Sequence, residues 1–334
     1  MTDPSQSPQS VRQVQPVQPG APPVPEISVV LPMHDEAPNV TEIVTRVAME
    51  LDALGRPAEI ICVDDGSSDD TAALVERYAE KDDRLVLVRF SRNFGKEAAL
   101  AAGLDTARGR AVVFMDADLQ HPPNLIPAMV AKWEEGFDVV DAFKATSADR
   151  GREPMPYRVA ANLFYALMGE HAGQQLHGSS DYKLLDRQVV DLLRQLPERH
   201  RFFRGIVAWV GFRVARVPLH VHRREAGASK WRPTMLVRYA VRNLVSFTST
   251  PLRLVAWLGL VTLVFDAVLG AQTFWNWWRG SAVTGFTTVI LTVVGLGGLI
   301  LLSLGVIAAY LAQMYDELKA RPIYVVRHPR SPER

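Results

Sequence analysis

Residues 111–123 read AVVFMDADLQHPP, and this stretch decides the fold that the sequence predicts. The apolar run 111–115 is typical of a short buried strand, and Asp116 and Asp118 follow where that strand ends. Two carboxylates one residue apart at a strand end can share a hard divalent cation that bridges two phosphates. The alternative is a solvated acidic loop, so the surrounding pattern decides between the two interpretations.

Short apolar strands alternate with helical patterns from residue 26 onward. Strands separated by helices of this length indicate βαβ units, so the predicted fold class is α/β, with a mostly parallel sheet flanked by helices. Ligands of such sheets bind beyond the carboxyl ends of the strands, where the acidic motifs of this chain fall. The predicted strands are 27–31, 59–63, 85–90, 111–115 and 137–142, and the predicted helices are 39–54, 68–81, 96–107 and 122–135.

The charge of the chain is divided unequally among its segments. The 334 residues carry a formal net charge of +1, but residues 26–200 are net −11 and residues 201–253 are net +10. Residues 254–312 contain only two charged side chains, Asp266 and Arg279. An acidic block, a basic block and an almost uncharged block indicate three physically different parts, and we expect no nucleic-acid partner.

The last third of the chain has the pattern of a membrane anchor. Residues 233–247 place apolar side chains on one helical face and Arg238 and Arg242 on the other, which suits an anionic bilayer surface. The apolar runs 254–275 and 287–312 are each long enough to span the hydrocarbon core. A buried hairpin in a soluble protein is the alternative interpretation.

Basic residues on either side of these runs predict the orientation of the anchor. Arg253 precedes the first run and Lys319 and Arg321 follow the second, whereas the connecting loop holds only Arg279. The positive-inside rule then places the α/β domain and both termini in the cytoplasm, on a bacterial plasma membrane. Asp266 is costly in lipid, so we expect it to face a partner helix or a second subunit in a homo-oligomer. The predicted parts are a disordered tail at 1–25, an α/β domain at 26–231, an amphipathic juxtamembrane helix at 232–252, a two-helix transmembrane hairpin at 253–313 and a cytoplasmic tail at 314–334.

Two further polar loops follow predicted strands and meet Asp116 at the same edge of the sheet. Residues 63–67 read VDDGS, in which Asp64 and Asp65 offer acceptors suited to a ribose or a base. The other loop contains Pro32, His34, Asp35 and Glu36. A pocket with so many acidic side chains would repel a diphosphate unless a metal ion or basic groups compensate.

Basic side chains that can compensate are present in three places. Lys96 follows Asn93-Phe94-Gly95 at a predicted helix start, where backbone amides also favour anions. Residues 223–231 read RREAGASKW, a loop suited to a nucleotide diphosphate, a lipid phosphate or both; attraction to anionic lipid headgroups is the alternative. The third group follows the fifth predicted strand and consists of Lys144, Arg150, Arg152 and Arg158.

Six motifs, taken in their order along the chain, resemble those of a known family. They are VDDGS, NFGKEAAL, DADLQHPP, SDYKLLDR, RREAGASKW and TSTPLR, and they are similar to motifs of membrane-bound polyisoprenyl-phosphate glycosyltransferases. That group resembles dolichyl-phosphate mannose synthase and belongs to the family 2 glycosyltransferases of GT-A fold. The resemblance covers about residues 26–312, and it implies inverting transfer of one hexose from a UDP- or GDP-sugar to a polyprenyl or dolichyl phosphate, with Mg²⁺ or Mn²⁺ as cofactor.

The resemblance also implies a role for each matching residue. Asp116 and Asp118 would bind the metal and the donor diphosphate, Gln120 would be a further metal ligand, and Ala117 would contact the donor. Asp181 matches an acidic residue proposed as base or positioner, which with Asp118 would be catalytic, although its own sequence context is typical of a cap or a turn. The nucleoside site would contain Pro32, His34, Glu36, Val63 and Asp65, and phosphates would be held by Lys144, Arg224 and Lys230. We also expect Lys96 to bind the donor and Ser229, within the basic loop, to bind the acceptor phosphate.

Two other functions share part of this pattern. A processive polysaccharide synthase has the same soluble fold. Such enzymes carry more membrane spans than the two predicted here, and their Q-x-x-R-W motif does not occur in the sequence. A non-catalytic, membrane-anchored nucleotide-binding scaffold is the second alternative, and the intact acidic motifs argue against it. An acceptor phosphate is already anionic at pH 7, so the reaction needs in-line placement and charge neutralisation more than proton removal.

Overall fold

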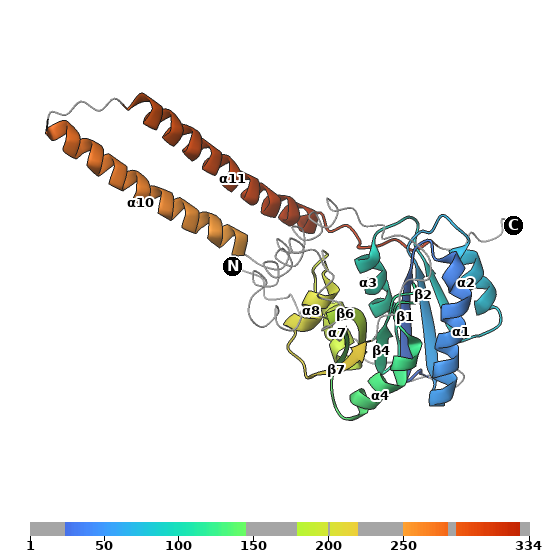
Figure 1. The fold of residues 1–334 in the computed structure, drawn as a ribbon. Coiled ribbons are helices and arrows are strands. Elements are labelled where there is room, and N and C mark those ends of the chain that lie inside the picture. The colour runs from blue at the N-terminus through green and yellow to red at the C-terminus, as the bar shows by residue number, and fades with distance from the viewer. Residues whose placement is uncertain (1–23, 145–178, 200, 220–249, 280–284, 328–334) are drawn as a thin grey trace, which may run out of the picture.

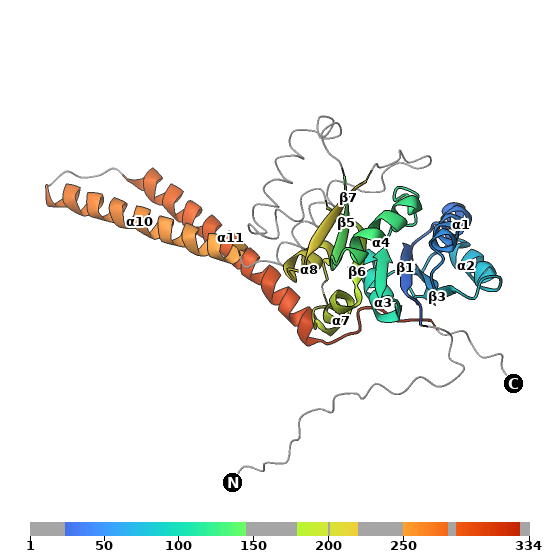
Figure 2. The same cartoon turned by 90° about the horizontal axis from the view of Figure 1, so that it is seen from below.

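The computed structural model describes residues 24–144, 179–199, 201–219, 250–279 and 285–327. These residues form an α/β domain from which two long helices project together (Figures 1 and 2). The predicted N-terminal tail up to residue 23 and the predicted amphipathic helix at 233–247 lie outside the described residues.

The described part of the domain is built on a seven-stranded sheet with the order β3-β2-β1-β4-β6-β5-β7. Only β6 runs antiparallel to its neighbours, so the predicted α/β class with a mostly parallel sheet of GT-A type is confirmed. All five predicted strands are present, whereas the sequence patterns do not predict β6 and β7. The strands are β1 (Ile27–Met33), β2 (Ala58–Asp64), β3 (Leu85–Arg89), β4 (Ala111–Phe114), β5 (Val139–Lys144), β6 (Ser179–Asp186) and β7 (Val214–Leu219).

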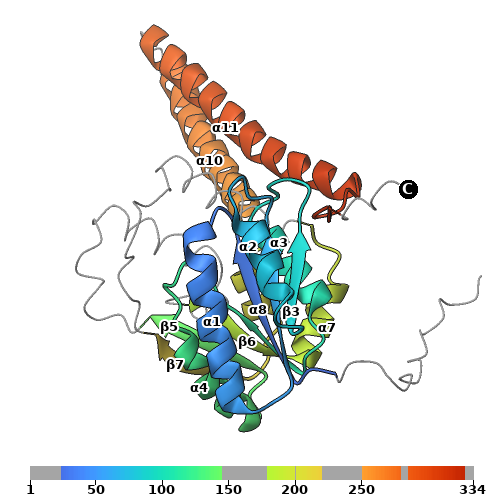
Figure 3. The same cartoon turned by 90° about the vertical axis from the view of Figure 1, so that its right-hand side faces the viewer.

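Helices cover both faces of the sheet, because apolar residues point to both sides of its central strands. Helices α1, α2 and α4 pack on one face, and α3, α7 and α8 pack on the other (Figure 3). The four predicted helices correspond to the first four α-helices. The helices are α1 (Ala37–Leu54), α2 (Thr71–Ala79), α3 (Lys96–Thr106), α4 (Ile126–Glu134), α7 (Arg187–Gln195) and α8 (Phe203–Trp209), and a 3₁₀ turn, η1 (Pro123–Leu125), precedes α4.

Helix α3 lies unusually close to the sheet, and this closeness positions the site. Its residues 98–104 are all buried, and most of them are alanine. A Cβ atom at Gly103 would lie 2.2 Å from Cγ1 of Val30 in β1, so only glycine permits this approach. The first residue of α3, Lys96, is thereby held above the carboxyl edge of the parallel strands.

The two projecting helices are α10 (Thr250–Trp278) and α11 (Phe286–Leu318). They lie side by side, contact each other and extend away from the domain (Figures 1 and 2). Segments Thr250–Asn276 and Thr292–Leu318 have mean hydropathies of 2.1 and 2.3, and neither is buried in protein, so both are long and apolar enough to cross a membrane. Asp266 lies within α10 and is partly exposed.

The chain returns to the α/β domain after α11. This helix continues to Leu318, past the predicted end of the hairpin at residue 313. Arg199 then holds its end, because the guanidinium donates to the backbone carbonyls of Glu317 at 3.1 Å and Arg321 at 2.8 Å. Residues 323–326 pack against the domain core beside Phe90, where the sequence predicted a tail.

Candidate active site

Asp65 joins two loops at the carboxyl edge of the sheet. Its carboxylate accepts hydrogen bonds from the backbone amides of Phe94 at 2.6 Å and Gly95 at 2.9 Å. Burial raises the pKa of Asp65, while these two amides act in the opposite direction. Gly66 has a φ of 64°, and a Cβ atom there would lie 2.3 Å from the carbonyl carbon of Arg92. The VDDGS motif therefore holds the loop that leads to Lys96.

The loop after β1 packs against the same motif. The Asp35 amide donates to Oγ of Ser67 at 2.9 Å, and its carboxylate accepts from the Ser68 amide at 2.8 Å. Asp35 has a φ of 54°, a strained conformation that these contacts stabilise. Hydrogen bonding to Ser68 lowers the pKa of Asp35.

The residues predicted for a nucleoside site lie around these loops, but they are not equally accessible. His34 Nε2 lies 3.0 Å from Nδ2 of Asn93, and Oε2 of Glu36 accepts from Nδ2 of Asn39 at 2.6 Å. Pro32 is partly exposed at the end of β1. The Val63 side chain is fully buried in the core, so only its backbone is placed to contact a nucleoside.

The DADLQHPP motif forms a turn that is held in place by its own residue His121. The Asp116 amide donates to Nδ1 of His121 at 2.9 Å, so the other ring nitrogen carries the proton. Burial lowers the pKa of His121, although nearby carboxylates oppose this, and its ring stacks on Tyr182 at 5.1 Å. The sequence patterns indicated no role for His121; its position three residues after the D-x-D pair was the available signal.

The rest of this turn presents oxygen atoms. The Gln120 amide donates to Oδ1 of Asp118 at 3.1 Å, and Leu119 between them adopts a φ of 62°. Asp116, Asp118 and Gln120 are all partly exposed, and Ala117 is buried. Within the described ranges, no three His, Cys, Asp or Glu side chains are grouped closely enough to hold a metal ion. The oxygen donors of this turn fit Mg²⁺ or Mn²⁺ only if a ligand, such as a diphosphate, completes the coordination.

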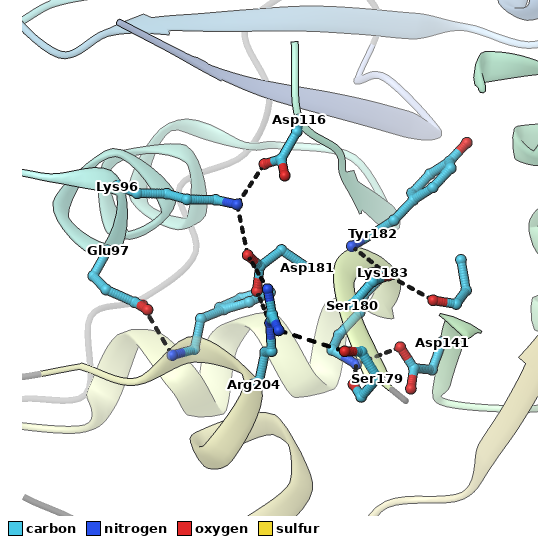
Figure 4. Close-up of polar contacts among 12 residues, drawn as sticks. Lys96, Glu97, Asp116, Asp141, Ser179, Ser180, Asp181, Tyr182, Lys183 and Arg204 are labelled. Carbon is cyan, nitrogen blue, oxygen red and sulfur yellow. Dashed lines mark hydrogen bonds and ion pairs between the residues drawn. The ribbon is translucent and has the colours of Figure 1, made fainter. Parts of the chain in front are cut away.

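Lys96 connects this turn to Asp181. Its Nζ lies 2.6 Å from Oδ1 of Asp116 and 2.6 Å from Oδ2 of Asp181 (Figure 4). Arg204 grips Asp181 from the other side, with Nε at 2.5 Å from Oδ1 and Nη2 at 2.8 Å from Oδ2. Figure 4 shows the order Asp116, Lys96, Asp181 and Arg204, and we refer to these four residues as the ionic cluster.

The charges of this cluster fix its protonation states. Burial alone would raise the pKa of Asp181, but Arg204 and Lys96 hold it well below its usual range. Burial likewise opposes the charge on Lys96, but the two carboxylates raise its pKa. Asp181 is therefore a permanent anion at neutral pH. Arg204 was missed by the sequence analysis, because it belongs to the basic block and no local motif marks it.

Glu97 is a second side chain of this candidate site to which the sequence patterns assigned no role. It follows Lys96 in α3, and its Oε2 accepts from the Phe203 amide at 2.9 Å, directly before Arg204 in α8. Burial, followed by the charge of Asp181, raises the pKa of Glu97 to about 7. Glu97 therefore links the two helices that supply cations to Asp181.

We expect Glu97→Gln to remove a pH dependence of stability. The ordinary pKa of the group is 4.5, so between pH 4.5 and 7 the folded chain retains a proton that the unfolded chain loses. The free energy of unfolding should therefore fall by about 3 kcal/mol as the pH rises through this window, at about 1.4 kcal/mol per pKa unit, and stay level above it. Thermal melts from pH 4.5 to 8 measure this; wild type and variant should match at low pH, with the variant more stable at pH 8.

The exposed Glu76 of α2 provides the matched control for this experiment. Glu76→Gln should leave the difference in melting temperature from wild type constant over the same range. A constant difference for Glu97→Gln as well would show that Glu97 has an ordinary pKa in the folded chain.

A cavity of about 250 Å³ lies on the Asp181 side of the sheet. Its polar wall includes Lys183, whose side chain is 4% exposed and whose Nζ lies 2.5 Å from Oδ1 of Asp141 and 2.7 Å from Oγ of Ser179. Burial lowers the pKa of Lys183, against the opposing charge of Asp141. Arg204 borders both the cavity and Asp181. The cavity is lined by Val139, Asp141, Ser179, Lys183, Arg204, Val207, Ala208, Val214 and Arg216.

Several predicted phosphate-binding residues cannot be placed in this site. Lys144 is the last residue of β5, and its side chain is not among the described parts. Arg224, Ser229 and Lys230 lie outside the described residues. Their predicted roles stay predictions.

Comparison with known proteins supplies an independent line of evidence. The model of the family described as glycosyl transferase family 2 matches residues 28–193. A glycosyltransferase of Synechocystis, sll0501, is 39% identical over 306 residues, which cover 90% of this chain and 94% of that protein. The SfII prophage-derived bactoprenol glucosyl transferase of Shigella flexneri is 33% identical over 304 residues, covering 90% and 97%. Glucosyl-3-phosphoglycerate synthase of Mycobacterium tuberculosis, solved with Mn²⁺, uridine diphosphate and phosphoglyceric acid, has a TM-score of 0.49 at 22% identity, covering 68% of this chain and 78% of that chain.

Proposed function

The chain belongs to glycosyltransferase family 2, and from this premise we propose that it transfers one hexose from a nucleotide-sugar to a polyprenyl phosphate in a membrane, with inversion at the anomeric carbon. The observation that carries the proposal is the ionic cluster, which joins the D-x-D turn to Asp181 through Lys96. A relative named for glucosyl transfer to bactoprenol matches almost its whole length, and this supports the polyprenyl acceptor.

The reaction needs the acceptor phosphate oxygen to attack the anomeric carbon as the bond to the donor diphosphate breaks. The phosphate is already anionic, so the site must place it in line and neutralise the leaving diphosphate. Lys96 stands between the D-x-D turn and Asp181, where it can stabilise negative charge that develops on the diphosphate. The lining of the neighbouring cavity carries three cations, Lys183, Arg204 and Arg216, against one carboxylate, Asp141, and this excess of positive charge supports an anionic acceptor on that side.

Asp181 acts in this proposal as a positioning group rather than as a base. A general base is most effective when its pKa lies near the working pH, whereas Arg204 and Lys96 hold the pKa of Asp181 well below its usual range. Its carboxylate instead fixes the two cations on either side of it. Of the two roles that the family resemblance implies for Asp181, base and positioner, the proposal therefore keeps the positioner.

The proposed cofactor is Mg²⁺ or Mn²⁺, held by Asp116 and Asp118 with Gln120 as a further ligand. A bound divalent cation supplies charge stabilisation to the leaving diphosphate. Two carboxylates are a common protein contribution to such sites, because substrate phosphates and water supply the other ligands. Because Asp116 also contacts Lys96 at 2.6 Å, a bound cation would compete with this ammonium for the Asp116 carboxylate.

The proposed location is a bacterial plasma membrane, with α10 and α11 as the two spans and the domain and both termini in the cytoplasm. The hydropathy of both helices supports the spans, and the basic residues Arg253, Lys319 and Arg321 at their domain-proximal ends support the orientation. Asp266 within α10 supports a homo-oligomer, in which it would face a partner helix.

Transfer can be tested directly with the purified full-length protein. The protein is incubated with undecaprenyl phosphate, Mg²⁺ or Mn²⁺ and, one at a time, UDP-glucose, UDP-galactose, UDP-N-acetylglucosamine and GDP-mannose, and lipid products are identified by mass. A product one hexose heavier than the lipid phosphate is expected with one of these donors. A polymeric product would favour a processive synthase, and nucleotide binding without any product would favour a scaffold.

A further inference from the structure

We propose that residues 321–327, which follow the second apolar helix, form a strap that positions the donor loop, residues 90–96, with Tyr324 as its positioning residue. The link to the donor rests on the proposed function, whereas the link between the strap and the loop rests on the geometry alone. No sequence motif marks this segment.

The strap pairs with the chain at the edge of the sheet. Val326 forms an antiparallel bridge with Phe90, which directly follows the edge strand β3. The Ser91 amide donates to the Val325 carbonyl at 2.9 Å, and the Arg327 amide donates to the Arg89 carbonyl at 2.7 Å. These backbone bonds lie on either side of the bridge and pair backbone groups of Arg89 and Ser91 where the edge strand ends.

Tyr324 makes the side-chain contacts of the strap. Its ring stacks on Phe90 with centroids 5.0 Å apart and an interplanar angle of 13°, and its hydroxyl donates to Oδ2 of Asp105 in α3 at 2.9 Å. Burial, and then the bond to Asp105, raises the pKa of Tyr324, so the hydroxyl stays protonated. The ring and the hydroxyl thus contact the beginning of the donor loop and the end of α3 at the same time.

The contacts continue from Phe90 to the ionic cluster. Phe90 meets Phe94 edge to face at 5.7 Å, and the amides of Phe94 and Gly95 donate to Asp65. Lys96 is the next residue, and its ammonium contacts Asp116 and Asp181. The path from Tyr324 to Lys96 therefore runs through packed rings and part-buried hydrogen bonds without a gap.

The strap also ties this path to the membrane helix. Arg199 donates from its backbone amide to Oε1 of Glu317 at 3.0 Å and from its side chain to the carbonyls of Glu317 and Arg321. The end of α11 is thereby fixed to the domain immediately before the strap begins. The proposed membrane helix α11 and the donor loop are consequently held in a fixed position relative to each other.

Hydrogen exchange of the amides of Ser91, Phe94 and Gly95 in the full-length protein tests the strap without any substrate. Tyr324→Ala, and truncation after Pro322, should speed their exchange by about tenfold, because local opening becomes easier once the ring and the bridge are lost. Tyr324→Phe keeps the stack and loses only the bond to Asp105, so it should have a smaller effect. Unchanged exchange in both Tyr324→Ala and the truncation after Pro322 would overturn the proposal.

Two matched variants control for changes elsewhere in the segment. The Val325 side chain is 45% exposed, and Val325→Ala leaves its carbonyl in place, so exchange should match wild type. Truncation after Arg327 retains the whole strap and should also match wild type. Faster exchange throughout the α/β domain in Tyr324→Ala would identify global destabilisation and would also count against a positioning role.

Kinetics then test the link to the donor. With the nucleotide-sugar that wild type uses best in the panel above, Tyr324→Ala should raise the KM for that donor about tenfold, while the KM for undecaprenyl phosphate stays within about twofold. An equal rise in both KM values would contradict the link. If wild type transfers no sugar, the proposed function fails, and the exchange measurement still decides whether the strap holds the loop.

Discussion

Replacing Asp116 or Asp118 with asparagine is expected to lower sugar transfer by about 10³-fold or more, while the fold stays intact. Each carboxylate would lose the charge that holds a divalent cation against the donor diphosphate. Both side chains are partly exposed at the end of β4, so neither substitution leaves a cavity in the core. Initial rates measured by mass detection of the lipid product, together with thermal melts, separate lost chemistry from lost stability.

The two substitutions should also differ in stability. Asp116→Asn weakens the contact with Lys96 and leaves that ammonium with Asp181, whereas Asp118 is fixed by the Gln120 amide, a bond that asparagine can also accept. Asp70→Asn is the matched control, because Asp70 is an exposed acid on the same edge whose side chain makes no capping bond. Its transfer rate should equal that of wild type.

Removal of the metal tests the same site from the other side. A chelator such as EDTA should abolish transfer in wild type, and added Mg²⁺ or Mn²⁺ should restore it. Full activity in both Asp116→Asn and Asp118→Asn, or transfer that survives chelation, would show that the D-x-D pair does not hold the donor through a metal ion.

Elements with strong local patterns were predictable from the sequence. The apolar strands that become β1 to β5, and the helices between them, each carry their own periodicity and end signals. The position of Asp116 and Asp118 follows from the strand that precedes them. The two helices that are long and apolar enough to cross a membrane follow from length and hydropathy alone.

Contacts between distant segments were not predictable in this way. β6 runs antiparallel between β4 and β5, and only this pairing brings Asp181 to Lys96 and Arg204. Asp65 could be assigned to a nucleoside site by its motif, but its bonds to the amides of Phe94 and Gly95 depend on how two loops meet. The order of residues along the chain indicates neither the antiparallel pairing of β6 nor the way in which these two loops meet.

The same limit applies to the end of the chain. Ile323, Tyr324 and Val326 form too short a pattern to predict an element, and their packing depends on Phe90, which lies far away in the sequence. Residues that act through tertiary partners are therefore the ones that sequence reasoning missed, Arg204, Glu97 and Tyr324 among them.

Asp181→Asn is expected to lower the turnover number by about 10²-fold or more, with a modest loss of stability. The Asp181 side chain is 10% exposed, whereas Lys96 and Arg204 are 41% and 37% exposed, so both cations can regain water when their anion is neutralised. The free energy of unfolding should consequently fall by only about 1–2 kcal/mol, below the cost of breaking a fully buried pair. The loss of activity must then come from the misplaced cations.

The pH profile distinguishes positioning from base catalysis at Asp181. Because its pKa is held well below the ordinary value of 3.8, Asp181 stays ionised down to low pH, and its contribution to stability is lost progressively as the pH falls from the ordinary pKa through the pKa of the folded state. Turnover per enzyme in wild type should therefore show no acidic limb from Asp181 between pH 5 and 8. The double variant Asp181→Asn with Arg204→Gln restores the charge balance, so it should regain stability relative to Asp181→Asn without regaining activity. An acidic limb near pH 6 that disappears in Asp181→Asn but persists in Glu97→Gln would instead identify Asp181 as a base, because Glu97, whose pKa is raised to about 7, is the neighbouring group that could otherwise produce the limb.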